Sequence, residues 1–205
     1  MTSPTPLQFG TYYHIYNRGN NRENIFFEDR NYRYFLQLYA KYVEPVADTY
    51  CYCLLPNHFH LLVRIKTVEE QSSRTETLRV SETLRVLQPS QRFGNLFNAY
   101  TKAINKAYER TGSLFQNPFG RKPVDSDAYF IWLITYIHQN PQKHGLIDDF
   151  RAWTYSSYHA HNSDQPTRLK RDDVLAWFGG VGAYQAHHRR QVTDRQVTPL
   201  VPDDF

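Results

Sequence analysis

The sequence predicts an α+β fold in which helices pack on a small antiparallel sheet. Short segments of β-branched and aromatic residues alternate with longer segments whose apolar residues follow helical spacing, and proline and glycine separate them. Hydrophobic residues make up 40% of the 205-residue chain and charged residues 21%, so it can bury a core and is not disordered throughout. The length fits one domain of ordinary size with an appendage.

The N-terminal part is expected to form a strand, a helix and a strand hairpin. Residues 11–16 are aromatic and β-branched, which predicts a strand, and the polar run 17–22 ends it as a turn. Asp29 caps a helix whose apolar residues repeat at helical spacing until Pro45. The next two strands, separated by a short turn at Pro56-Asn57, are 48–55 and 58–66.

The middle of the chain contains a polar insertion, residues 67–89. Within it, residues 75–80 are nearly repeated as 81–86, but two copies of six residues are too few for a repeat fold. We expect an inserted loop or hairpin. Ser90 then caps a second amphipathic helix that ends near Gly112.

The next elements are a strand within 114–124 and a third helix. Proline and glycine make this strand irregular or place it at an edge. The helix begins at Ser126 or Asp127 and ends at Asn140-Pro141, because proline disfavours helical backbone before it. The order of the first six elements matches the split βαβ arrangement of ferredoxin-like folds.

The predicted organisation is a domain over 1–150 followed by a C-terminal extension over 151–205. The extension carries enough tryptophan and tyrosine to dock on the domain, and residues 198–205 are expected to fray. No segment approaches the 18 or so apolar residues of a membrane helix, and the N-terminus lacks signal-peptide features. We therefore expect a cytoplasmic protein without a membrane partner. Cys51 and Cys53 are too far apart on a strand for a relaxed disulfide, which predicts reduced thiols.

Charge and aromatic content point weakly to nucleic acid. The 24 Lys and Arg exceed the 20 Asp and Glu, and aromatic residues reach 16%, which suits pairing with phosphates and stacking on bases. Any single ring is more often part of the core. The candidate stacking rings are Tyr12, Tyr16 and Phe119. The candidate phosphate contacts are Arg18, Arg22, Arg121, Lys122 and Lys143.

Two histidines are candidates for a metal site. Side chains alternate along a strand, so His58 and His60 share one face while Phe59 points to the other. Neighbouring positions on one face allow both imidazoles to reach one ion. By itself such a pair is weak evidence, because it also occurs in strands without any ion.

The third helix offers complementary groups. Tyr136 and Asn140 lie about 40° apart around the helix and one turn along it, so a phenol and an amide oxygen can point at one place. The alternative is that Tyr136 packs at the core boundary and Asn140 ends the helix before proline, and spacing alone favours that alternative. Tyr129 lies on nearly the same face as Tyr136, and spacing does not decide between them.

Two sequence blocks change this assessment. Residues 53–63, CLLPNHFHLLV, and 136–146, YIHQNPQKHGL, closely resemble the single-tyrosine transposases of the HUH endonuclease superfamily. They are most similar to the branch that includes the REP-associated tyrosine transposases. Supporting blocks occur in the right order at 13–19, 112–116 and 153–158, so the resemblance covers about residues 11 to 160.

The resemblance implies a ferredoxin-like nuclease that cuts and rejoins single-stranded DNA, with hairpins as targets. It implies that His58 and His60 bind a divalent ion, that Asn140 is the third protein ligand, and that Tyr136 is the nucleophile of a 5′-phosphotyrosyl intermediate. Nitrogen and oxygen ligands without thiolate favour Mg²⁺ or Mn²⁺. Relatives include dimers that exchange the tyrosine helix, so a homodimer is possible. No residue stands out as the general base.

Three other interpretations remain open at this stage. The first is a structural zinc site formed by Cys51, Cys53, His58 and His60, although their spacing is unusual for such a site. The second is a nucleic-acid-binding sheet without chemistry, against which the absence of an RNP1 pattern argues. The third is a replication initiator or relaxase, which no helicase segment or second nucleophile supports.

Overall fold

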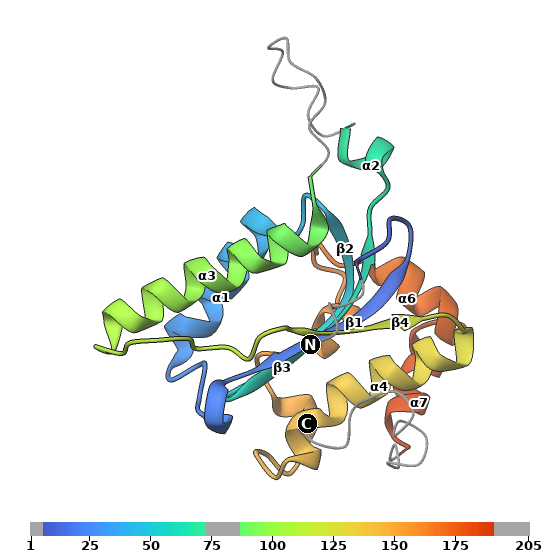
Figure 1. Ribbon diagram of the computed structural model, residues 1–205. Helices are drawn as coiled ribbons and strands as arrows, with labels where there is room; N and C mark the ends of the chain where they lie inside the picture. Colours follow the sequence, from blue (N-terminus) through green and yellow to red (C-terminus); the bar gives the residue numbers. More distant parts are fainter. Residues whose placement is uncertain (1–5, 73–86, 191–205) are drawn as a thin grey trace.

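The computed structural model describes residues 6–72 and 87–190. A four-stranded antiparallel sheet, in the order β2-β3-β1-β4, lies between two layers of helices (Figure 1). The strands are β1 (Tyr12–Arg18), β2 (Ala47–Leu55), β3 (His58–Ile65) and β4 (Gly120–Val124). The helices are α1 (Asp29–Tyr42), α2 (Val68–Ser72), α3 (Pro89–Ala107), α4 (Asp127–Lys143), α5 (Tyr158–His161), α6 (Arg171–Phe178) and α7 (Val181–His188), with 3-10 turns at Asn20–Arg22 and Phe150–Ala152.

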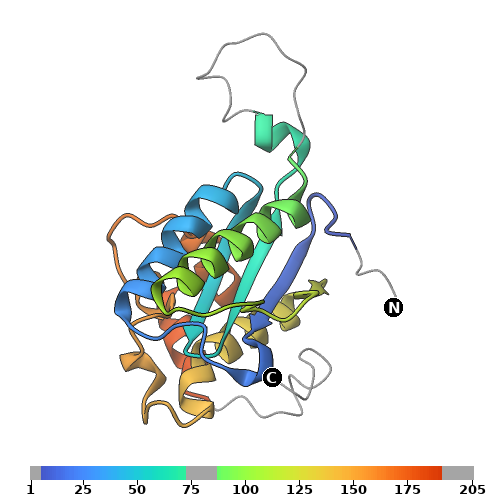
Figure 2. The same ribbon diagram turned by 60° about the vertical axis from the view of Figure 1, so that its left-hand side comes forward.

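The connections confirm the ferredoxin-like arrangement. β3 lies between β2 and β1 and pairs antiparallel with both. β1 lies between β3 and β4 and pairs antiparallel with both. The α1 helix connects β1 to β2, and α3 lies in the connection from β3 to β4. Right-handed crossovers place both helices on one face of the sheet. Figure 2 shows α1 and α3 side by side on that face.

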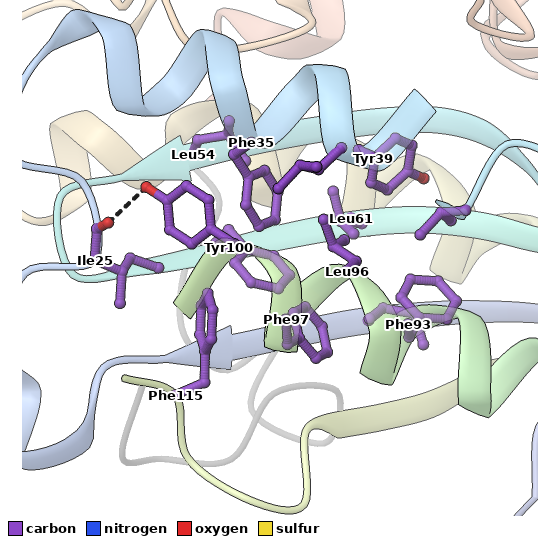
Figure 3. Close-up of a cluster of buried hydrophobic side chains, with 14 of the residues drawn as sticks. Ile25, Phe35, Tyr39, Leu54, Leu61, Phe93, Leu96, Phe97, Tyr100 and Phe115 are labelled. Carbon is purple, nitrogen blue, oxygen red and sulfur yellow. Dashed lines mark hydrogen bonds between the residues drawn. The ribbon is translucent and has the colours of Figure 1, made fainter. Parts of the chain in front are cut away.

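The face beneath α1 and α3 holds an apolar core rich in rings. Phe35, Phe59 and Tyr100 are completely buried there, and the Phe35 ring meets the Tyr100 ring edge-on at a centroid distance of 5.2 Å (Figure 3). The Tyr100 hydroxyl donates a 2.7 Å hydrogen bond to the Ile25 carbonyl oxygen, so its polar end is satisfied. This core anchors the sheet whose opposite face carries the polar groups.

The opposite face lies against α4. Tyr16 pairs with His60 and Arg18 with His58 across β1 and β3, so these four side chains share a face. Phe59 belongs to the core on the other side, as the alternation predicts. The strand pairing therefore brings polar side chains from two strands together beneath one helix.

Several element boundaries differ from the sequence prediction in the first half of the chain. β1 continues to Arg18, because Asn17 and Arg18 keep their pairing with β3 instead of turning away. The α1 helix does begin at Asp29, but its N-cap is Glu28, which forms a capping box with Asn31. Glu28 thus has the N-cap role that the sequence prediction gave to Asp29: its side chain accepts from the Asn31 N–H, and the Asn31 side chain accepts from the Glu28 N–H.

The later boundaries differ as well. Pro89 occupies the first turn of α3, where its missing N–H costs nothing, and the helix ends at Ala107 rather than near Gly112. Only the last five residues of the predicted 114–124 strand form β4. α4 continues through Pro141 to Lys143, so the prediction that it ends at Asn140-Pro141 was wrong. The His144 N–H donates to the Asn140 carbonyl oxygen at 3.0 Å and closes this last turn.

The two described ends of the 67–89 insertion are joined by Gln71. Its side chain accepts a 3.2 Å hydrogen bond from the Leu87 N–H and donates to the Lys66 carbonyl oxygen at 3.4 Å. The near-repeat at 75–86 and the predicted fraying at 198–205 lie outside the described residues.

Residues after 150 contact the edge strand β2. The Trp153 indole N–H donates a 2.9 Å hydrogen bond to the Leu54 carbonyl oxygen, and the Tyr52 N–H donates at 2.9 Å to the Ser157 hydroxyl. The division of the chain at residue 150 stays a prediction. Of the helices in 6–72 and 87–190, none combines the length and the apolar character needed to cross a membrane.

Candidate active site

β3 places His58 and His60 next to each other beneath α4. Their rings have a centroid distance of 5.2 Å and lie edge to face. Only 2% of the surface of His58 and none of that of His60 is exposed. The turn at 56–57 ends just before His58, so the first residue of the strand already points into this buried space.

Each histidine has a polar neighbour at Nδ1. The Asn57 amide oxygen is 2.6 Å from His58 Nδ1, and His14 Nε2 is 2.9 Å from His60 Nδ1. An amide oxygen only accepts, and at 2.6 Å the Asn57 oxygen favours the His58 tautomer that carries its proton on Nδ1 and leaves Nε2 unprotonated. In His60, Nδ1 faces His14 and Nε2 lies on the opposite side of the ring.

Asn140 brings its amide oxygen to the same place. Its Nδ2 donates to the Tyr136 carbonyl oxygen at 3.4 Å, which fixes the amide orientation, and its Oδ1 lies 3.4 Å from His58 Nε2. Asn140 lies inside α4 and is completely buried, so it is not the helix terminator that spacing alone favoured. When the His58 proton is on Nδ1, Nε2 and Oδ1 are two acceptors that face each other; when it is on Nε2, the same contact is a hydrogen bond donated to Oδ1.

This geometry fits a divalent cation. Two neighbouring octahedral ligands at about 2.1 Å from an ion are roughly 3 Å apart, close to the separation of His58 Nε2 and Asn140 Oδ1. Within 6–72 and 87–190, no group of three or more histidine, cysteine, aspartate or glutamate side chains is placed to hold a metal. A cation here would therefore depend on the amide oxygen of Asn140 as its third protein ligand.

The electrostatic environment keeps both histidines neutral. Burial, followed by nearby His144 and Arg18, lowers the pKa of His58 to about 3. Burial, followed by His14 and His58, lowers the pKa of His60 well below its usual value. A neutral imidazole is the form that binds a metal, so at pH 7 the protonation state already suits coordination.

The two cysteines are unsuited to the zinc alternative. Both are completely buried, and burial raises the pKa of Cys51 and of Cys53 above that of an ordinary thiol. Within the described residues, these cysteines and histidines form no group of three or more that is placed to hold a metal, as a structural zinc site requires. Cys53 pairs with His60 across β2 and β3.

Tyr136 lies beside this pair of histidines. Its ring centroid is 5.8 Å from that of His60, and the Lys143 ammonium is 5.1 Å from the ring centroid. Only 4% of Tyr136 is exposed, although Lys143 is itself exposed. Burial, followed by nearby Tyr16 and Asp125, raises the pKa of the competing Tyr129, which disfavours its phenolate.

Three of the five predicted phosphate contacts lie on the histidine face. Arg18 pairs with His58 across β1 and β3, Lys122 pairs with His14 across β4 and β1, and Lys143 lies over the Tyr136 ring. Only 8% of Arg18 is exposed. These cations would raise the local positive potential at a bound phosphate.

The other two predicted contacts are placed differently. Arg121 points to the α3 side of the sheet, where its guanidinium stacks on Phe119 at 3.9 Å and donates to the Ser90 hydroxyl at 3.0 Å. Arg22 is exposed beyond the end of β1, near the turn, where its carbonyl oxygen accepts a 3.5 Å hydrogen bond from Asn57. Arg121 is therefore not brought together with the histidines.

The predicted stacking rings are largely packed against other side chains. Tyr12 contacts the rings of Tyr50, Phe130 and Trp177, while Phe119 contacts those of Phe93 and Phe97. Tyr16 is buried, next to His14 and His60. These rings support the fold around the site rather than offering open platforms.

Sequence reasoning missed three residues at the site: His14, Asn57 and His144. The His144 ring lies 4.9 Å from that of His58, just beyond the end of α4. All three fall within or next to the sequence blocks that carry the resemblance, which was the available signal. Their contacts depend on strand register and on the exit of α4, which spacing along the chain does not give.

Comparisons with known proteins agree with the motifs. No family model matches the chain. A protein of Haemophilus influenzae named as a putative REP-associated tyrosine transposase is 26% identical over 113 residues, which cover 55% of this chain and 59% of that relative. The chain thus matches somewhat over half the length of this curated relative.

A solved structure confirms the fold. It is that of a REP-associated tyrosine transposase bound to a REP hairpin, and it matches with a TM-score of 0.58 and 16% sequence identity over 81% of this chain and 88% of the other. The chain is therefore similar to REP-associated tyrosine transposases, as the sequence blocks predict.

Proposed function

We propose that the protein is a metal-dependent endonuclease and strand transferase for single-stranded DNA, acting in transposition or in the processing of REP elements. The observation that carries the proposal is the convergence of His58 Nε2 and Asn140 Oδ1, 3.4 Å apart, beside His60 and the Tyr136 ring. A transposase activity agrees with the name of the curated relative.

The reaction is a transesterification at phosphorus. The phenolic oxygen of Tyr136 forms a bond to phosphorus while the bond from phosphorus to the 3′-oxygen breaks, giving a 5′-phosphotyrosyl link and a free 3′-OH. The phenol loses one proton and the leaving oxygen gains one, so the step needs no net proton exchange. Because the bond energy is retained, the reverse reaction rejoins strands without ATP.

The main chemical difficulty is the weak acidity of the phenol. With a pKa near 10, an ordinary tyrosine is about 0.1% ionised at pH 7, a deficit of roughly 4 kcal/mol if full phenolate is required. His58, His60 and Asn140 would hold Mg²⁺ or Mn²⁺, which supplies phosphate binding and stabilisation of developing negative charge when bound. Arg18 adds a fixed positive charge on the same face, and Lys143 adds one over the attacking ring.

The proposed substrate is single-stranded DNA that forms a hairpin. The solved relative is bound to a REP hairpin, and Arg18, Lys122 and Lys143 form the cationic part of the site face. Lys143 is exposed, and its ammonium is 5.1 Å from the Tyr136 ring centroid, so it can contact a phosphate brought to that ring. We place the protein in the cytoplasm, where DNA is accessible and both thiols stay reduced.

The decisive experiment detects the covalent intermediate. Labelled single-stranded hairpin DNA is incubated with the protein and Mn²⁺, and the products are separated on a denaturing gel, with mass spectrometry of the attached peptide. We expect an adduct on Tyr136 that disappears in Tyr136→Phe, while that variant still binds the hairpin. Tyr129→Phe is the matched control, because it removes a nearby hydroxyl from the same helix and should keep the adduct.

Three outcomes would contradict the proposal. An adduct that persists in Tyr136→Phe and vanishes in Tyr129→Phe would reassign the nucleophile. Hairpin binding without any adduct or cleavage would indicate a non-catalytic binding protein. Stoichiometric, tightly held zinc in protein purified without added metal would favour the structural zinc site instead.

A further inference from the structure

A third histidine, His14, lies behind the pair on β3. It belongs to β1 and faces the same side of the sheet as His60. Its Nε2 is 2.9 Å from His60 Nδ1, and the two rings stack with a centroid distance of 5.1 Å and an interplanar angle of 27°. Both side chains are completely buried, so water does not compete for this hydrogen bond.

We propose that His14 is a positioning residue that sets the tautomer and ring orientation of His60 for metal binding. The proposal rests on the proposed function, since it assumes a cation held by His58, His60 and Asn140. A ring nitrogen binds a metal only when it carries no proton. His60 therefore coordinates through Nε2 when its proton sits on Nδ1 and is donated to His14 Nε2.

The opposite tautomer pair would block the site. If His14 donated its Nε2 proton to His60 Nδ1, the only proton of neutral His60 would sit on Nε2, at the position needed for coordination. In the competent pair, His14 keeps its own proton on Nδ1 and only accepts through Nε2. The arrangement resembles that of His58, whose Nδ1 proton is fixed by the Asn57 oxygen at 2.6 Å.

The variants for the test follow from the difference between Asn57, the neighbour of His58, and His14, the neighbour of His60. The amide oxygen of Asn57 permits one tautomer of His58, whereas the imidazole of His14 permits either tautomer of His60. Glutamine at position 14 would offer an amide oxygen to His60 Nδ1 and preserve the competent tautomer. Leucine at position 14 would fill the space without any acceptor.

The test measures Mn²⁺ binding without DNA, by electron paramagnetic resonance of free Mn²⁺. We expect His14→Leu to weaken the affinity by about 10–100-fold and His14→Gln to remain within a few-fold of the unmodified protein. Tyr39→Phe is a control for the loss of a buried hydrogen bond, because Tyr39 bonds Thr49 at 2.7 Å away from the site. It should lower stability and leave Mn²⁺ affinity unchanged.

A second measurement reads the tautomer directly and does not depend on the folding of a variant. Nitrogen-15 NMR of the unmodified protein saturated with Mg²⁺ should show His60 protonated on Nδ1. Finding the His60 proton on Nε2 would overturn the proposal, as would Mn²⁺ affinity in folded His14→Leu equal to that of the unmodified protein.

His60→Ala separates this inference from the proposed function. If His60→Ala binds Mn²⁺ as tightly as the unmodified protein, the proposed metal site fails, and the role of His14 fails with it. If His60→Ala loses the ion while His14→Leu keeps it, the metal site stands and only the positioning role is wrong.

Discussion

At the scale of single residues, the site depends on atoms that a neighbour has already oriented. Asn140 is fixed by its own helix through the Tyr136 carbonyl, and His58 by the residue before it in the chain. Ligands held in this way lose little freedom when an ion binds, which favours affinity. The polar neighbours would thus contribute to affinity by holding in place the atoms that face the proposed ion.

Asn140 gives the sharpest residue-level prediction. Asn140→Ala should reduce Mn²⁺ affinity at least tenfold, because it removes the proposed oxygen ligand, while alanine is well tolerated inside a helix. Asn140→Asp should keep or increase the affinity, since it returns the oxygen with a negative charge. Titration with Mn²⁺ and circular dichroism of both variants check this. Equal affinity in Asn140→Ala would show that the amide is not a ligand.

Some residues of the site could be predicted from the sequence and others could not, for a physical reason. The shared face of His58 and His60 follows from strand alternation within one segment, so it was available without coordinates. The contact of His14 with His60 depends on which strands pair and in which register, and a single sequence does not specify that. Arg121 was misplaced for the same reason, because its face depends on the register of β4 against β1.

At the scale of elements, the pairing of β1 with β4 requires a glycine. Tyr16 lies opposite Gly120, and a Cβ added at Gly120 would be 2.0 Å from Cε2 of the Tyr16 ring. The ring is itself confined, with His14 at a centroid distance of 4.8 Å and His60 at 6.2 Å. The absence of a side chain at 120 therefore keeps the Tyr16 ring off the histidines.

Gly120→Ala should accordingly damage both the fold and the site. Forcing the ring aside is expected to cost about 1–3 kcal/mol of unfolding free energy, as overpacking does, and to weaken Mn²⁺ binding through the displaced histidines. Denaturant unfolding and Mn²⁺ titration measure the two effects. Gly94→Ala in α3 is the control, since nothing lies within 4 Å of its added Cβ, and it should be neutral or stabilising. Similar behaviour of the two variants would refute this account.

The limits of helix α4 show where local rules fail. Pro141 was expected to end the helix, but two more helical residues follow it, and the second, Lys143, lies over the Tyr136 ring. A proline near the C-terminal end of a helix removes one backbone hydrogen bond, and packing of a buried helix outweighs that loss. The helix period nevertheless placed Tyr136 and Asn140 on one stripe correctly, because that relation is local.

At the scale of the whole molecule, α4 is tied to its own sheet by buried polar contacts. His138 lies 2.8 Å from the Ser157 hydroxyl and 2.9 Å from His188, and Ser157 accepts a hydrogen bond from the β2 backbone at Tyr52. Moving α4 onto another copy would leave these groups buried without partners, or would require the extension to move too. We therefore expect each chain to supply both its histidines and its tyrosine to one site.

Mixing two inactive variants tests this expectation. Tyr136→Phe lacks the proposed nucleophile and His60→Ala lacks a proposed metal ligand, so a mixture should form no DNA adduct if both parts come from one chain. The unmodified protein diluted to the same concentration is the positive control. Adduct on the His60→Ala chain in the mixture would mean that the tyrosine helix acts on a neighbouring copy.

The same buried network makes the fold sensitive to acid. Burial lowers the pKa of His188 to about 3, and the pKa of His138 is also well below its usual value. Between about pH 6.5 and 3 the unfolded chain binds protons at these positions that the folded chain does not, so the unfolding free energy decreases as pH falls. Their contribution to stability is fully present only above about pH 6.5.

We therefore expect the melting temperature of the metal-free protein to fall between pH 7.5 and pH 5. The pH dependence should be weaker in His188→Gln, because one of the groups that protonates on unfolding is gone. Thermal melts at several pH values, monitored by circular dichroism, measure both. A melting temperature that is constant or rises toward pH 5 would contradict the assignment of neutral, buried histidines.

The unequal character of the two sheet faces has a consequence for divergence among related sequences. Beneath α1 and α3 the core is almost purely hydrocarbon and aromatic, so exchanges that conserve volume cost little there. On the α4 side, buried imidazole, amide and hydroxyl groups contact one another in pairs, and a single exchange would leave its partner buried without a polar neighbour. Sequence changes should accumulate on the α1 and α3 side of the sheet, leaving the α4 side nearly unaltered while overall identity declines.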